Sequence, residues 1–187
     1  MKRFFIAAIA GFLVLATMAQ GSAQYGDERA PRLALRIGIH RPSGDRLKSE
    51  LGSNWKLLGL QYSLSSDELE RPTAYAAVQI SSDEGTDSEA SLMSIQYERV
   101  WWARKSEGGS AYYGAGAGLY FLNQKDRPFA WMEWTERSGT KLGFTGLAGY
   151  EIKQGYFAEI RYSKIGKLAE GLDFSGLSLS IGARLSF

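Results

Sequence analysis

The chain has 187 residues, among them 22 basic and 20 acidic side chains, one histidine and no cysteine. Without cysteine, it can form neither a disulfide nor a thiolate nucleophile or metal ligand. The nearly balanced charge argues against a nucleic-acid partner, and a single histidine argues against a histidine-rich metal site. We therefore expect neither a metal nor another cofactor.

Residues 1–23 have the organisation of a secretory signal peptide. Lys2 and Arg3 provide a basic start, an apolar stretch follows over 4–16, and small residues precede a cleavage point after Ala23. A membrane anchor is the alternative, but the apolar stretch is shorter than the ~20 residues that a spanning helix needs. We expect this segment to be removed on export.

The rest of the chain is long enough for one domain with its own core. Both basic residues of the first 23 positions are lost on cleavage, and no acidic residue lies there, so twenty of each sign remain. We expect a short lead over 24–31 and a single domain over 32–187.

Eight stretches of this domain alternate apolar and polar residues. Successive side chains of a strand point to opposite faces, so a period of two predicts strands, and no stretch has a convincing helical period. The predicted strands are 33–40, 55–63, 73–81, 92–102, 111–122, 141–152, 155–163 and 176–187. All four prolines lie at strand starts or between strands, where they remove no ladder hydrogen bond.

The connections between these strands alternate in length. Longer ones follow strands one, three, five and seven, and shorter ones follow strands two, four and six. The longer connections are 41–54, 82–91, 123–140 and 164–175. An even strand number, long loops at one end and short turns at the other are typical of a membrane barrel with both termini in the periplasm.

Apolar side chains occupy one face of the predicted strands, while most charges and glycines occupy the other. Rings on the apolar face lie near the strand ends, as expected for belts at two membrane interfaces. A soluble lipocalin-like barrel would instead turn the apolar face inward. That arrangement would leave most glycines and several charges outside, so we expect the apolar face to meet lipid.

The polar face then lines a lumen that side chains can fill. Four rings on this face can plug it: Trp55, Tyr75, Tyr112 and Tyr120. Six charged residues share the face: Arg36, Glu98, Glu151, Glu159, Arg161 and Arg184. An unpaired charge there would cost several kcal/mol, so we expect a mutually paired network with Glu159 beside Arg184. This network is either a gate or relay through the barrel, or the packing of a closed lumen.

The last stretch, GLSLSIGARLSF, ends on an aromatic residue with apolar residues at alternate positions before it. It resembles the C-terminal assembly signal of bacterial outer-membrane barrels, carried here by Leu179, Ile181, Ala183, Leu185 and Phe187. The stretches YYGAGAGLYF and GLAGYEIKQGYFAEIRYS are similar to small outer-membrane barrels of the OmpA/OmpX type. An ordinary edge strand that ends there by chance is the alternative.

The resemblance covers residues 32–187 and implies an all-β fold, an eight-stranded antiparallel up-and-down transmembrane β-barrel. It further implies a porin-like but closed monomer in the outer membrane, surrounded by lipid and lipopolysaccharide. By the same resemblance, the barrel-assembly machinery reads the terminal residues during biogenesis.

His40, the one histidine of the chain, is a candidate catalytic residue. A serine hydrolase needs its histidine beside a serine and an acid. Ser163 and Asp45 are conceivable partners, but no motif places them near His40. We expect a histidine at the rim that faces water or loops, and no catalytic residue.

Two connections contain candidate binding residues. The stretch 123–140 has rings and a thioether between charges, at Phe129, Trp131, Met132 and Trp134. These residues form either a surface for a ligand or partner, or a strand extension with a collapsed cap. The stretch 81–90 has four acids, but their spacing does not match an EF-hand loop, so we expect a solvated acidic loop rather than a calcium site.

The sequence therefore predicts a non-enzymatic outer-membrane protein that acts in envelope structure or surface interaction through its long loops. A narrow conduit or binding site for small, hydrophobic molecules is the alternative. A lipid-modifying enzyme is a further alternative.

Overall fold

The computed structural model describes residues 32–66, 71–85, 87–103, 108–127, 133–152, 155–168 and 172–186. The expected signal peptide and lead, the terminal Phe187 and the loop residues Phe129, Trp131 and Met132 lie outside this part. Within the described ranges, no helix is long and apolar enough to cross a membrane.

One short helix and eight strands make up the fold. They are β1 (Arg32–Pro42), α2 (Asp45–Leu51), β2 (Trp55–Ser66), β3 (Pro72–Glu84), β4 (Ser88–Trp102), β5 (Gly109–Asp126), β6 (Thr135–Ile152), β7 (Tyr156–Ile165) and β8 (Gly176–Ser186). Each strand pairs with the next in the chain, and β8 returns to β1 to close the barrel.

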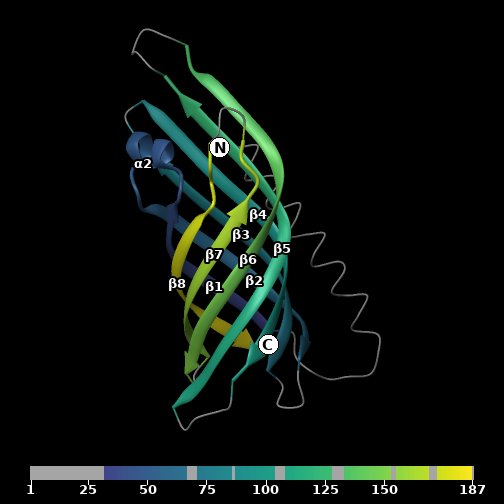
Figure 1. The fold of residues 1–187 in the computed structure, drawn as a ribbon. Coiled ribbons are helices and arrows are strands. Elements are labelled where there is room, and N and C mark those ends of the chain that lie inside the picture. Colours follow the sequence, from purple (N-terminus) through teal and green to yellow (C-terminus); the bar gives the residue numbers. More distant parts are fainter. Residues whose placement is uncertain are drawn as a thin grey trace.

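The closing ladder is antiparallel, like all the others. It runs from Arg32 opposite Ser186 to Pro42 opposite Gly176. Figure 1 shows the strands strongly tilted around the barrel, with α2 at the end opposite the C-terminus. The predicted eight-stranded antiparallel up-and-down barrel is confirmed.

Apolar side chains cover the outside of the barrel. Leu142, Phe144 and Ile181 are 73%, 70% and 62% exposed, whereas Thr145 and Ser180, on the opposite parity, are buried inside. Exposure of so continuous an apolar surface to water would be unfavourable. The alternation therefore identifies the outside as the lipid-facing side of a transmembrane barrel.

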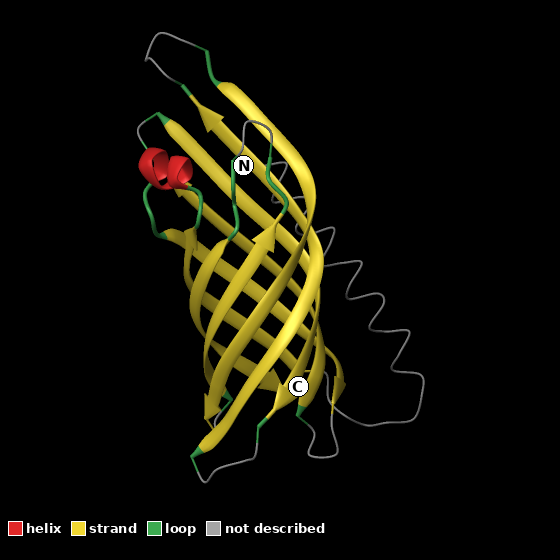
Figure 2. Ribbon diagram, in the orientation of Figure 1, coloured by secondary structure: helices red, strands yellow, loops and turns green. Residues whose placement is uncertain are grey.

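The barrel is taller on one side. Both β5 and β6 have 18 residues, whereas β7 has 10, so the β5–β6 hairpin rises beyond β7 (Figure 2). The predicted long loops 82–91 and 123–140 are mostly strand, and only residues 85–87 and 127–134 connect the strands there. Those predictions were wrong because both faces of a strand meet water above the membrane, where the alternation weakens.

The helix α2 was not predicted either. It buries Leu47 and Leu51, which are four positions apart, and an ion pair joins Arg46 to Glu50 at 2.8 Å on the exposed side. It ends at Gly52, whose positive φ of 87° suits glycine. Seven residues contain too few apolar positions to show a helical period.

Candidate functional site

The middle of the lumen contains a cluster of two arginines and two glutamates. From β7, Arg161 donates to both carboxylate oxygens of Glu98 on β4, with Nη2 to Oε2 at 3.0 Å. The same guanidinium donates to Glu159 Oε1 at 2.8 Å. From β1, Arg36 donates to Glu159 Oε1 at 3.0 Å. We call Arg36, Glu98, Glu159 and Arg161 the central cluster.

Neutral side chains complete the hydrogen bonds of the central cluster. Gln61 on β2 donates to Glu98 at 3.0 Å, and Gln79 on β3 accepts from Arg36 at 3.0 Å. The Tyr112 hydroxyl on β5 donates to Glu159 at 3.2 Å. Side chains of the cluster are at most 2% exposed, so solvent reaches them from neither end. Balanced charge and near-complete hydrogen bonding offset the cost of burying four ions.

Glycines beside the cluster make room for its long side chains. A Cβ at Gly59, opposite Arg36 in the β1–β2 ladder, would overlap the Arg36 side chain. A Cβ at Gly149 would likewise overlap the Tyr112 ring. The glycines on the inner face therefore let large residues cross a narrow lumen.

A second charged group lies nearer the end of the barrel at which β8 ends. There Arg184 pairs with Glu151 and also donates to the Tyr75 hydroxyl. Four rings surround its guanidinium, with centroid distances between 5.0 and 5.6 Å: Tyr75, Trp102, Tyr112 and Phe157. Such cation–π contacts stabilise a desolvated guanidinium and close this end of the lumen.

The structure thus brings the six predicted lumen charges together in two groups. The expected contact between Glu159 and Arg184 was wrong. Glu159 lies opposite Ser180 in the β7–β8 ladder, and Arg184 lies beyond Ala183, the residue opposite Tyr156 at the start of β7. The stagger between the strands therefore separates the two side chains.

Hydroxyl and amide groups follow on the side of the central cluster that faces α2. The Tyr120 hydroxyl lies 2.6 Å from Thr145 Oγ1 and 3.0 Å from Gln96 Oε1. Ser163 extends this chain of contacts, 2.9 Å from Thr145. The side chains of this layer are uncharged.

The end of the lumen near α2 is apolar, which was not predicted from the sequence. Here α2 and the loop before β8 fold over the mouth and bury one apolar cluster. Its members include Leu47, Leu51, Trp55, Leu92, Leu122, Leu172 and Phe174. We call this cluster the apolar cap. A plug of this kind excludes water from above, as the central cluster does from below.

His40 lies under the apolar cap and not at a water-facing rim, so that expectation was wrong. It is fully buried, its Nδ1 is 3.0 Å from Ser178 Oγ, and its ring meets Trp55 edge-on at 5.9 Å. In the described part of the chain, its hydroxyl partner is Ser178, and no hydrogen bond joins it to Ser163 or Asp45. A buried pair with no acid and no access for substrate gives no support to hydrolysis.

Among the candidate loop residues, the structure places Trp134. It is exposed, and the Arg127 guanidinium lies 5.0 Å from its ring. Arg127 also pairs with Asp87 at 3.1 Å, which joins the two tallest connections. No group of three or more histidine, cysteine or acidic side chains in the described ranges is placed to hold a metal ion.

The loop before β8 has its own polar contacts. Asp173 accepts a hydrogen bond from the Ser175 backbone N–H at 2.9 Å and lies 3.6 Å from the Lys164 ammonium. Burial by itself would raise the pKa of the Asp173 carboxyl, but the bonds from Ser175 and the nearby Lys164 charge outweigh it and lower that pKa. The ionised form of Asp173 therefore favours the local turn with Ser175 and the ion pair with Lys164.

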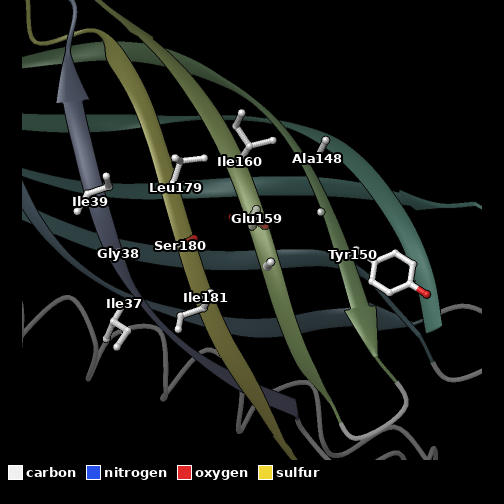
Figure 3. Close-up of a pocket in the computed structure, with 12 residues that line it drawn as sticks. Ile37, Gly38, Ile39, Ala148, Tyr150, Glu159, Ile160, Leu179, Ser180 and Ile181 are labelled. Carbon is white, nitrogen blue, oxygen red and sulfur yellow. The ribbon is translucent and has the colours of Figure 1, made fainter. Parts of the chain in front are cut away.

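A hollow on the outside of the barrel crosses β1, β8, β7 and β6. Small residues such as Ala148 and Ala158 leave about 560 Å³ between taller neighbours, among them Ile160 and Tyr150. Figure 3 shows Ile37, Ile39, Leu179 and Ile181 projecting around it, away from the lumen. Its apolar lining and its outward position make it part of the lipid-facing surface.

The predicted assembly signal lies on β8, of which the structure describes four positions. Leu179, Ile181 and Leu185 are exposed on the lipid-facing side, with Ala183 on the same parity. Phe187 lies outside the described residues. The alternation in this tail is therefore that of a strand that closes the barrel against β1.

Comparisons with known proteins agree on the fold. No family model and no curated protein matches the chain. Among solved structures, the N-terminal β-barrel domain of Pseudomonas aeruginosa OprF aligns with a TM-score of 0.61 at 12% identity, covering 82% of this chain and 97% of that one. Neisserial surface protein A (NspA) aligns with a TM-score of 0.53 at 15% identity, covering 84% and 96%. The chain thus has the fold of small outer-membrane barrels, as the sequence resemblance predicted.

Proposed function

We propose that this protein is an integral outer-membrane barrel with a closed lumen, which acts through its extracellular end in surface interaction and not by transport or catalysis. One observation carries the proposal: the central cluster crosses the lumen and solvent reaches it from neither end. The apolar cap above it is a second barrier. A lumen blocked twice is suited to holding the strands together rather than to passing a solute.

The extracellular end offers the surface that such a role needs. The β5–β6 hairpin rises beyond β7, and Trp134 is exposed at its tip. The apolar outer belt fixes the barrel in lipid, so these groups project from the membrane at a constant height. Lipid and lipopolysaccharide are its surroundings in this proposal, and the barrel-assembly machinery recognises the β8 tail.

Two measurements test the proposal. The first asks whether the protein occurs in isolated outer membranes as a band that migrates differently on detergent gels before and after boiling. A soluble periplasmic protein without such a shift would contradict the location. The second compares conductance in planar bilayers between the wild-type chain and the E98A/R161A double variant.

We expect no stable conductance from the wild type. Removal of the bridge between β4 and β7 leaves the apolar cap in place, so we expect at most brief openings from the double variant. Steady wild-type channels would overturn the closed lumen and favour the alternative, a narrow conduit.

A further inference from the structure

Arg99 places a cation on the lipid-facing side of β4. Its side chain is exposed and has the parity of Tyr97 and Trp101, which are exposed on the outer face. The ladders on both sides of β4 have no register shift up to Arg99, which lies opposite Ala74 of β3 and Ala115 of β5. Because no bulge turns the side chain inward, its charge meets the membrane.

The counter-ion of Arg99 is not part of the described chain. Within the described ranges, no carboxylate forms an ion pair with its guanidinium. Glu98, the residue before it, points into the lumen and pairs with Arg161. A cation on the outer face of a barrel is costly at the middle of the membrane and tolerated near its surface, where a long side chain reaches the head groups. We therefore look for the anion among the lipids.

The position of Arg99 along β4 puts it near one membrane surface. It lies three residues before the end of the strand at Trp102. Since β4 runs in the same direction as β8, this is the end of the barrel with the C-terminus, opposite α2 (Figure 1). The neighbouring Trp101 stacks on Tyr113 of β5, with ring centroids 5.8 Å apart. Rings of this kind are favoured at the depth of lipid head groups.

A row of small residues leads from Arg99 towards the middle of the membrane. Its ladder partner Ala115 lies opposite Gly146 of β6, where an added Cβ would meet nothing within 4 Å. The exposed rings of Tyr113 and Phe144 border the row on its two sides. Gly146 lies six residues before the end of β6, against three for Arg99 in β4, so the row rises away from the membrane surface. An acyl chain can lie along it.

We propose that Arg99 binds the headgroup phosphate of an anionic glycerophospholipid, with phosphatidylglycerol as the test case, and that an acyl chain of this lipid lies along the row of small residues. The inference rests on the proposed function, because the end with Arg99 must face the periplasm, where glycerophospholipids form the leaflet. A guanidinium presents paired N–H donors that match two phosphate oxygens. In the described chain, no carboxylate paired with Arg99 could receive the ammonium group of a zwitterionic lipid, which favours an anionic one.

A second copy of the chain fits this surface less well. In a two-fold interface the same patch of both subunits meets, so the two Arg99 side chains would approach each other. Neither patch contributes an anion in the described ranges, and like charges repel strongly where water is excluded. A lipid phosphate, in contrast, neutralises the charge.

The test uses Trp101 as the reporter, because it lies two residues from Arg99. The parent protein keeps Trp101, has phenylalanine at the other tryptophan positions and is folded into vesicles. These vesicles mix phosphatidylcholine with either brominated phosphatidylglycerol or brominated phosphatidylcholine, and the quenching at each brominated fraction gives the relative affinity of the two lipids. We expect phosphatidylglycerol to bind about fivefold more tightly, since one basic side chain near an anionic lipid surface contributes about that factor.

Two variants of this parent assign the preference to a residue. R99Q keeps a long polar side chain without the charge, so we expect it to abolish the preference for phosphatidylglycerol. K56Q is the matched control, because it removes an exposed cation from the outer face at the start of β2, near α2. The control should keep the preference of the parent. The boiling-dependent band shift is recorded for every variant as the check of folding.

Equal binding of the two lipids by the parent, or the same preference in R99Q and the parent, would overturn the inference. Loss of the preference in K56Q would also overturn it, because the attraction would then not be local, as would a dimer that R99Q dissociates. If the band shift persists and both brominated lipids quench Trp101 equally, the inference fails and the proposed function stands. Absence of the band shift and of quenching by either lipid would contradict the proposed function itself.

Discussion

Arg161 and Glu98 form a two-pronged ion pair between strands that are not neighbours in the barrel. The two guanidinium nitrogens of Arg161 on β7 donate to the two carboxylate oxygens of Glu98 on β4. Ladder hydrogen bonds join only adjacent strands, so this pair is a direct link through the lumen. Because both side chains are at most 2% exposed, the link also blocks the lumen.

Removal of one partner of this pair should be costly. We expect E98Q to lower the free energy of unfolding by roughly 3–5 kcal/mol, because Arg161 would keep a buried charge with one carboxylate fewer. The measurement is urea unfolding in lipid vesicles, followed by tryptophan fluorescence. The control K125M removes an exposed pair with Glu136 at 3.8 Å, which should cost about 1 kcal/mol or less. Equal effects of E98Q and K125M would contradict a buried link.

The faces of the strands could be predicted from the sequence, but the partners in the lumen could not. A period of two places Arg36, Glu98 and Glu159 on the inner face whatever the register. Which of them meet depends on the stagger between strands, and residue spacing along one strand contains no information about it. This is why Arg184 was expected beside Glu159 and pairs with Glu151 instead.

Parity would have placed His40 correctly had it been applied to the end of β1. His40 has the same parity as Arg36 and Gly38, and it lies inside the barrel. The position near a loop suggested a watery rim, because the sequence gives no sign that α2 folds back over the mouth. A cap formed by a short helix and a distant loop is a tertiary feature that local periodicity does not show.

Gly59 should tolerate no side chain. A methyl group at this position would overlap Arg36, so G59A is expected to lower the free energy of unfolding by about 1–3 kcal/mol. Gly146 is the matched control, because it lies on the outer face and an added Cβ would meet nothing within 4 Å. G146A should leave stability unchanged or raise it slightly. The measurement compares the urea midpoints of unfolding of the two variants with that of the wild type in the same vesicles. A G59A midpoint equal to that of the wild type would show that the Arg36 side chain can move aside.

The apolar cap should come loose without loss of the barrel. We expect L47D to expel α2 from the mouth, because the substitution places a charge in the apolar cluster. Trypsin added to intact cells should then cut at Arg46 or Lys48, while the band shift on detergent gels persists. The control S49D changes an exposed position of the same helix and should stay resistant. Resistance of L47D to trypsin would mean that Leu47 does not hold the cap.

Tryptophan quenching should show directly which face meets lipid. The chain has five tryptophans, of which Trp101 is 45% exposed on the outer face and stacks on Tyr113, whereas Trp55 is fully buried in the lumen. In variants that keep one of these two and carry phenylalanine at the other tryptophan positions, brominated acyl chains should quench Trp101 strongly and Trp55 weakly. The band shift on detergent gels serves as the check that both variants are folded. Strong quenching of Trp55 with little quenching of Trp101 would mean that the face with Trp55 meets lipid and the face with Trp101 does not. This result would contradict both the closed polar lumen and the lipid-facing apolar belt.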